Sequence, residues 1–302
     1  MIARLRRLGL ILRFFAARAR VRIQPPPPRV PLAAWNAMFD RSRLPDLEKE
    51  KRQLEGFDIA LFVALNDPRV IGQIVFEYGT LVNWVSSWAG LRVLDIGSGR
   101  STLPNWMIAQ GAKVVSFEFP EPVERRWAGK LGRLNDFLLG AARRRLRQVS
   151  GSMVELPFAD QSFDLVTSLS VIEHLDTNLP DRSHVPYAEQ RKRAACVLDE
   201  MVRVTRPGGL IYLTSECCHY GRATTDAWRS SYYYHEGPAL SGAWPIEDVP
   251  EIFYDYLADR GCSLIGPIVL DPAWPGADAK ATFRGPQFSA FSVLARRESA
   301  KP

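Results

Sequence analysis

The sequence predicts an α/β fold, in which a mostly parallel β-sheet carries helices on both faces. From Leu91 onward, apolar runs of strand length alternate with stretches of helical periodicity. This alternation is typical of strand–helix–strand units, whose parallel strands are covered on both sides. The chain has 302 residues, of which 46% are hydrophobic and 24% charged, so it can bury a sizeable core.

The expected elements follow one another in chain order. Strands are expected at residues 91–97, 113–119, 146–150, 163–170, 209–215, 262–270 and 288–298. Helices are expected at residues 101–110, 121–145, 186–205 and 246–260. Gly111 follows the first of these helices and Pro207 follows the third, which agrees with the way these residue types end helices.

The first 30 residues differ in composition from the rest. Between Met1 and Val30 there are eight arginines and no acidic residue, whereas the whole chain has a net charge of only +6. The remainder is therefore close to neutral, and we expect no nucleic-acid partner from the charge. Apolar residues at helical spacing predict a basic amphipathic helix over residues 1–24, which could contact a membrane surface, act as a targeting segment or remain solvated.

The domain boundaries follow from this composition. The four prolines from Pro25 to Pro28 form a stiff spacer, so residues 1–30 are expected to be a tail and linker. Residues 31–90 are expected to form a helical cap whose aromatic residues pack into a core, and residues 91–302 the main domain. The four cysteines lack metal-site spacing, so we expect no metal. They are also too sparse for a disulfide framework, so we expect a reducing, cytoplasmic location, with the inner membrane surface as the alternative.

A glycine turn follows the first strand of the main domain. The strand runs into Gly97, Ser98 and Gly99 and then into a helix, an arrangement that presents backbone amides to a nucleotide-type ligand. Asp95 precedes this turn, and its carboxylate would repel a pyrophosphate but suit a ligand with an ammonium and a sulfonium. Thr102 occupies the position of the third glycine of dinucleotide sites, so a nicotinamide-dependent oxidoreductase is the weaker alternative.

Four segments in order strengthen this interpretation: VLDIGSG, an acid that ends the next strand, LPFADQSFDLVTSLSVIEHL and MVRVTRPGGLIYLTS. Together they resemble the successive motifs of class I S-adenosylmethionine-dependent methyltransferases, particularly the group that acts mainly on small molecules. The resemblance covers Leu91 to about Ser215. It implies a Rossmann-like seven-stranded sheet with an antiparallel last strand at its edge, formed by residues 288–298, and S-adenosylmethionine as cofactor.

The resemblance also implies the cofactor-binding positions, which are Asp95, Gly97, Ser98, Gly99, Glu118, Phe119, Ser152, Met153, Ser168 and Leu169. The residues of the glycine turn would hold the methionine part, and Glu118 the ribose, with Phe119 beside the adenine. Ser152 and Met153 stand where the family commonly has an acid for the adenine amino group, so contact there is weaker or made by backbone. Ser168 and Leu169 would line the methionine pocket through main-chain groups.

The acceptor side is less specific, because methyl transfer needs alignment of the reacting atoms and uses a general base only when the acceptor loses a proton. His174 could be that base or a structural histidine. After the fifth strand, His219, Tyr233, Tyr234 and His235 could line an acceptor pocket or form a packed surface loop.

The predicted function is therefore methyl transfer from S-adenosylmethionine to a small-molecule acceptor. A catalytically silent protein with the same fold is the alternative, because the usual adenine-binding acid is absent.

Overall fold

The structure is a computed structural model, and it describes residues 36–37, 77–78, 80–81, 84–98, 103–118, 147–176, 186–218, 244–266, 268–269 and 288–299. The basic tail over residues 1–30, most of the expected cap over residues 31–90 and the expected helix over residues 121–145 lie outside the described residues. Within the described part of the chain, no helix is long and apolar enough to cross a membrane.

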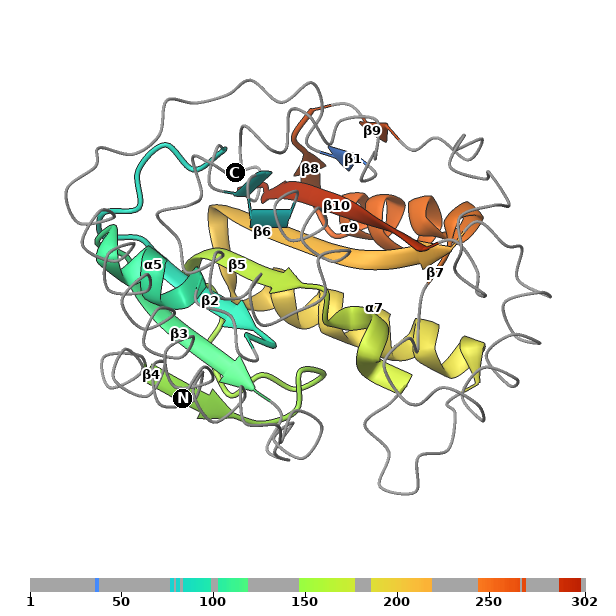
Figure 1. Cartoon of the computed structure of the whole chain (residues 1–302), viewed down its shortest axis with the longest axis horizontal. Helices are drawn as coiled ribbons and strands as arrows, with labels where there is room; N and C mark the ends of the chain where they lie inside the picture. The colour runs from blue at the N-terminus through green and yellow to red at the C-terminus, as the bar shows by residue number, and fades with distance from the viewer. Residues whose placement is uncertain are drawn as a thin grey trace, which may run out of the picture.

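The predicted α/β fold is confirmed. One sheet contains the strands β2 (Arg92–Ile96), β3 (Lys113–Glu118), β4 (Arg147–Ser150), β5 (Phe163–Leu169), β6 (Thr205–Cys218), β8 (Cys262–Leu264) and β10 (Phe288–Arg297). They lie in the order β4-β3-β2-β5-β6-β10-β8, and a two-residue strand, β7 (Trp244–Pro245), pairs with β6 (Figure 1). The pairs from β4 to β6 are parallel, and β10 is antiparallel to both of its neighbours.

Two expectations about the end of the chain were wrong. The antiparallel last strand, β10, does not lie at the edge of the sheet, because β8 pairs with its far side. The single strand expected over residues 262–270 is also divided. Gly266 has a positive φ of 85° after β8, and the chain then forms β9 (Ile268–Val269), which pairs with β1 (Asn36–Ala37) in a separate two-stranded sheet.

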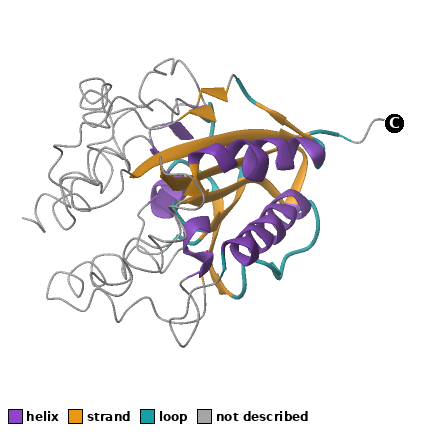
Figure 2. Ribbon diagram, turned by 90° about the vertical axis from the view of Figure 1, so that its right-hand side faces the viewer, coloured by secondary structure: helices purple, strands orange, loops and turns teal. Residues whose placement is uncertain are grey.

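Side chains of the central strands alternate between two buried clusters, one on each face of the sheet. Leu94 and Val166 belong to the cluster that contains α7 (Tyr187–Val204), whereas Val93 and Leu165 belong to the cluster that contains α5 (Leu103–Ala109). Residues Tyr78, Leu81, Val85 and Trp88 also pack in the α5 cluster, so the aromatic residues described before β2 are core residues. Figure 2 shows helices packed along the sheet.

Helix α7 forms where the sequence predicts a helix, because its apolar residues recur at helical spacing. Ala194, Val197, Leu198 and Met201 are buried on one face of this helix. The helix ends at Val204 and continues into β6, where the register with β5 shifts between Phe163 and Leu165.

The expected helix over residues 246–260 is instead three short pieces, a 3-10 turn (Ile246–Asp248), a π-helical turn (Pro250–Asp255) and α9 (Tyr256–Asp259). Pro250 lacks the amide hydrogen that a continuous helix would need.

Candidate cofactor site

Asp95 lies near the carboxyl end of β2 on the face that carries α5. Its side chain is only 3% exposed, and the hydroxyl of Thr167 on β5 donates a hydrogen bond of 2.6 Å to its Oδ1 atom. Thr167 stands directly opposite Asp95 in the register of the two strands. Burial raises the pKa of Asp95 to about 6, although the hydrogen bond from Thr167 and the nearby Ser98 hydroxyl act in the opposite direction. A positively charged ligand at this carboxylate would relieve the cost of its burial.

The glycine turn begins at Gly97, which has a positive φ of 71°. A Cβ atom at this position would lie 2.4 Å from Cγ1 of Val171, so only glycine fits between the turn and the segment that follows β5. The Ser98 hydroxyl donates to the backbone oxygen of Asp95 at 3.1 Å and accepts from the Ser116 hydroxyl at 2.7 Å. The Ser98 hydroxyl is therefore engaged within the protein, so any contact of Ser98 with a ligand would be made by its main chain.

The ends of β3 and β4 lie next to the turn. Glu118 is half-buried at the last position of β3, opposite Ser150 of β4, and its backbone oxygen accepts from the amide of Gly151 at 2.9 Å. Ser152 is exposed, whereas Met153 is buried in the same cluster as Phe117. The polar side chains described at this corner therefore include the half-buried Glu118 and the exposed Ser150 and Ser152.

The end of β5 completes this edge of the sheet. Ser168 is fully buried, and the alternation of side chains points its hydroxyl to the face opposite Asp95, so only its main chain could meet a ligand there. Leu169 packs on the Asp95 face. Ser170 follows with a positive φ of 51°, and its hydroxyl donates a hydrogen bond of 2.5 Å to Oε1 of Glu77. Glu77 is 3% exposed, so a buried carboxylate from far earlier in the chain also reaches this edge.

His174 lies on a 3-10 turn (Ile172–Asp176) directly after this edge and is half-buried. Its neighbour Glu173 is completely buried and accepts a hydrogen bond of 2.6 Å from the hydroxyl of Ser215. The indole of Trp244 donates to the same hydroxyl at 3.1 Å. The turn that carries His174 is therefore attached to β6 and to β7, which begins at Trp244.

Several predicted site residues lie outside the described residues. These are Gly99 in the turn, Phe119 after β3, and the acceptor-side residues His219, Tyr233, Tyr234 and His235. Among the described side chains, no group of three or more His, Cys, Asp or Glu is arranged to hold a metal ion. Cys196, Cys217 and Cys262 are free thiols.

Sequence reasoning missed the partners that hold the predicted residues. Thr167 was not singled out, although it is a polar residue within an apolar strand that runs beside β2. Such a residue indicates a buried polar contact, since an unpaired hydroxyl in a core is costly. Glu77 carries no comparable signal, because its contact with Ser170 spans 93 residues of sequence.

The chain is similar to known methyltransferases. Residues 94–213 match the family model described as a methyltransferase domain. A demethylmenaquinone methyltransferase of Thermobifida fusca is 27% identical over 175 residues, which are 56% of this chain and 63% of that protein. An uncharacterized methyltransferase of Mycolicibacterium vanbaalenii is 35% identical over 130 residues, 42% of this chain and 40% of that protein.

The chain therefore spans less than two thirds of the length of these two curated relatives. The fold also matches a solved S-adenosylmethionine-dependent methyltransferase from Mesorhizobium loti. The matched region covers 73% of this chain and 97% of that protein, with 17% sequence identity and a TM-score of 0.45.

Proposed function

We propose that this chain, whose residues 94–213 match the methyltransferase-domain model, is a class I S-adenosylmethionine-dependent methyltransferase that transfers a methyl group from S-adenosylmethionine to a small-molecule acceptor. The observation that carries the proposal is the buried carboxylate of Asp95, held by Thr167 beside the left-handed turn at Gly97. A carboxylate at this position suits the ammonium and sulfonium of the methyl donor and disfavours a pyrophosphate.

The described residues fit this cofactor. Asp95 would pair with the ammonium group, and Gly97 would allow the backbone to approach the methionine part, since a larger residue would collide with Val171. The Glu118 carboxylate would accept hydrogen bonds from the ribose hydroxyls. When bound, the cofactor would supply a methyl group on a sulfonium; the acceptor nucleophile would attack the methyl carbon in line, and the sulfur would leave as the thioether of S-adenosylhomocysteine. The protein has to align the acceptor with this methyl group and exclude water.

The class of acceptor is a further part of the proposal. The relatives include proteins named demethylmenaquinone methyltransferases, which is consistent with an acceptor of small-molecule size. His174 would act as a base only for an acceptor that loses a proton on attack. Its place directly after the end of β5 supports this role, because ligands of open α/β sheets lie beyond the carboxyl ends of the strands.

Calorimetry with S-adenosylmethionine and S-adenosylhomocysteine tests the cofactor. We expect both to bind to the full chain and Asp95→Ala to weaken both strongly while the circular dichroism spectrum stays unchanged. No binding at millimolar concentration would contradict the proposal, and a nicotinamide difference spectrum would favour the oxidoreductase. If the cofactor binds but no methyl-labelled product forms with a panel of polar and apolar acceptors, a catalytically silent protein would be the better description.

A peripheral membrane contact through residues 1–24 is a separate proposal, supported by the basic amphipathic pattern of that segment. We expect the full chain to float with anionic liposomes and a chain lacking residues 1–28 to remain at the bottom of the gradient. Equal flotation of the two forms would contradict this contact.

A further inference from the structure

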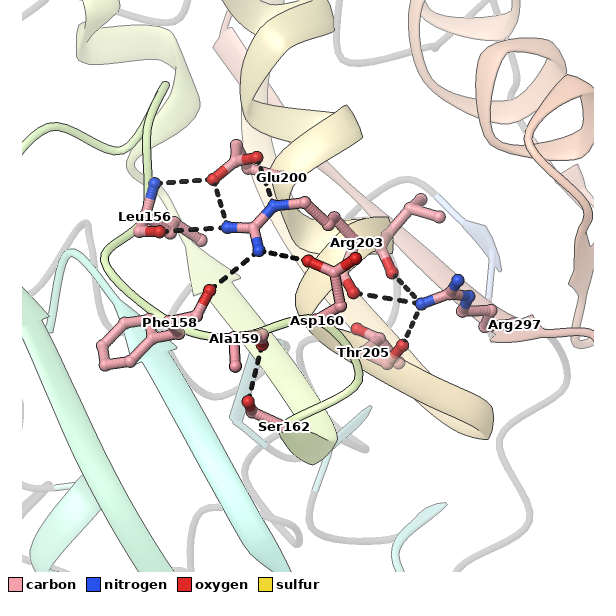
Figure 3. Close-up of polar contacts among 10 residues, drawn as sticks. Leu156, Phe158, Ala159, Asp160, Ser162, Glu200, Arg203, Thr205 and Arg297 are labelled. Atoms are coloured by element: carbon pink, nitrogen blue, oxygen red, sulfur yellow. Dashed lines mark hydrogen bonds and ion pairs between the residues drawn. The ribbon is translucent and has the colours of Figure 1, made fainter.

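A charged pair at the end of α7 holds the loop between β4 and β5 in place. Figure 3 shows the guanidinium of Arg203 between the carboxylate of Glu200 and this loop. Arg203 donates to both oxygens of Glu200 at 2.7 Å, and to Oδ1 of Asp160 at the same distance. Arg203 is 31% exposed and Glu200 only 17%, so the pair is largely screened from solvent. It raises the pKa of Arg203 and lowers that of Glu200, chiefly through the hydrogen bonds between them.

The pair binds the backbone of the loop at four points. The guanidinium donates to the carbonyl oxygens of Leu156 at 3.0 Å and Phe158 at 2.8 Å, and Glu200 accepts from the amide of Leu156 at 2.6 Å (Figure 3). The backbone oxygen of Arg203 also accepts from the amide of Gln161 at 2.9 Å. Because these hydrogen bonds are made to backbone groups, they fix the path of the loop itself and not merely the position of one of its side chains.

The held loop is continuous with the corner of the proposed cofactor site. Leu156 and Met153 are buried in one cluster with Phe117, which precedes Glu118 on β3. The ring of Phe158 packs edge-on against that of Phe117, with 5.9 Å between the ring centroids. A shift of the loop at Leu156 or Phe158 would therefore move Met153 and the backbone around it relative to Glu118.

The chain has no carboxylate at Ser152 or Met153, so the adenine amino group of the proposed cofactor would have to be contacted by backbone or by the Ser152 hydroxyl at this corner. We propose that Arg203 and Glu200 are positioning residues that hold the loop so that its backbone reads the adenine amino group of the cofactor. This inference rests on the proposed function and adds to it a source of specificity that lies outside the site. A backbone carbonyl can discriminate against a base that lacks the amino group only if its position is fixed.

The experiment compares two ligands, S-adenosylhomocysteine and the analogue in which a carbonyl oxygen replaces the adenine amino group. Calorimetry gives the ratio of their dissociation constants for the wild type, Arg203→Met and the control Arg260→Met. Arg260 is a suitable control because it also forms an ion pair with α7, the helix that carries Arg203. It lies 2.7 Å from Asp199 on that helix and is 36% exposed, but it connects α7 to the end of α9 and not to the loop.

For the wild type and for Arg260→Met, we expect the analogue to bind about tenfold more weakly, as for the loss of one buried hydrogen bond. For Arg203→Met we expect the ratio to fall toward one, because binding of the adenine form weakens while that of the analogue is unchanged. A purely structural role would weaken both ligands alike and leave the ratio unaltered.

The outcomes separate the two proposals. A wild type that binds neither ligand would contradict the proposed function, whereas a wild type that binds both equally would overturn only the inference. A ratio in Arg203→Met equal to that of the wild type would also overturn it. If Arg203→Met does not fold, Glu200→Gln takes its place, because glutamine keeps an acceptor oxygen for Leu156 but loses the charge that fixes Arg203. An unchanged ratio in that variant would overturn the inference as well.

Discussion

Gly97 and Val171 are in contact across the carboxyl edge of the sheet, so that the turn after β2 is closed by the chain that follows β5. A Cβ atom at Gly97 would lie 2.4 Å from one methyl group of Val171 and 2.5 Å from the other. The backbone of Gly97 also has a φ of 71°, a conformation that costs an L-residue about 1 to 2 kcal/mol. The position therefore excludes a side chain for two separable reasons.

We expect Gly97→Ala to destabilise the protein and to abolish detectable cofactor binding. Gly261→Ala is the matched control, because Gly261 has a φ of 72° and a Cβ atom there would meet no heavy atom within 4 Å. Both variants carry the backbone strain, but only Gly97→Ala adds overpacking, which costs about 1 to 3 kcal/mol. Urea denaturation measures the difference in unfolding free energy between the two variants.

Val171→Ala in the Gly97→Ala background tests the cause directly. Removing the two methyl groups relieves the two shortest contacts and leaves only the Cβ atom of Val171, at 3.0 Å, so the double variant should recover most of the stability lost to overpacking and retain the loss due to strain. A double variant that is less stable than Gly97→Ala would show that the contact with Val171 is not what excludes the side chain.

Cofactor affinity should depend on pH through Asp95. Burial raises the pKa of this carboxyl to about 6 in the free protein. Because the ammonium of the cofactor pairs with the ionised form, binding should weaken about tenfold for each pH unit below 6 and become constant above about 7. Calorimetry from pH 5 to 8 measures this profile, and Asp95→Asn should give a weak affinity without this step. Equal wild-type affinities at pH 5 and pH 7.5 would contradict the assignment of Asp95.

The same carboxyl should limit the stability of the free protein. Its folded pKa of about 6 exceeds the ordinary value of 3.8, so the fold favours the protonated form. The stability due to that form is complete below about pH 4 and is lost as the pH rises through 6. Asp95→Asn avoids this loss, and at pH 7.5 we expect it to raise the unfolding free energy by up to about 3 kcal/mol.

The control for stability is Asp164→Asn, which should have the opposite sign. Although burial raises the pKa of Asp164, hydrogen bonds from Arg92 and Arg206 dominate and lower it. Its ionised form is therefore favoured by the fold, and Asp164→Asn should reduce stability at pH 7.5. If both asparagine variants change stability in the same direction, the fold does not favour the protonated form of Asp95.

The local elements, and the carboxyl edge of the sheet at which the candidate site residues lie, could be predicted from the sequence. The strands β2, β3, β5 and β6 are runs of apolar residues, and each predicted site residue on them lies at or near the end where the sheet can bind a ligand. Such short-range patterns place Asp95, Gly97 and Glu118 without knowledge of the strand order, because parallel strands share one carboxyl edge.

Strand order and register could not be predicted in the same way, because they depend on contacts between distant segments. The apolar residues over 262–270 predict a strand, but no local feature records that its first part, β8, pairs with β10 and moves β10 from the edge to the interior of the sheet. Likewise, the identity of Thr167 as the partner of Asp95 follows from a register of β2 and β5 that no local sequence feature records.

The network behind His174 gives a prediction about stability that concerns one hydroxyl group. Ser215 donates to Glu173 at 2.6 Å and accepts from the indole of Trp244 at 3.1 Å, and all three residues are fully buried. Ser215→Ala removes a donor from a buried carboxyl group and an acceptor from a buried N–H group, so we expect a loss of about 2 to 4 kcal/mol. Ser263→Ala deletes a hydroxyl that donates to Glu298 at the surface, and it should change stability by less than about 0.5 kcal/mol. Urea denaturation compares the two variants, and equal small effects would mean that solvent reaches the network and that the turn of His174 is not fixed by it.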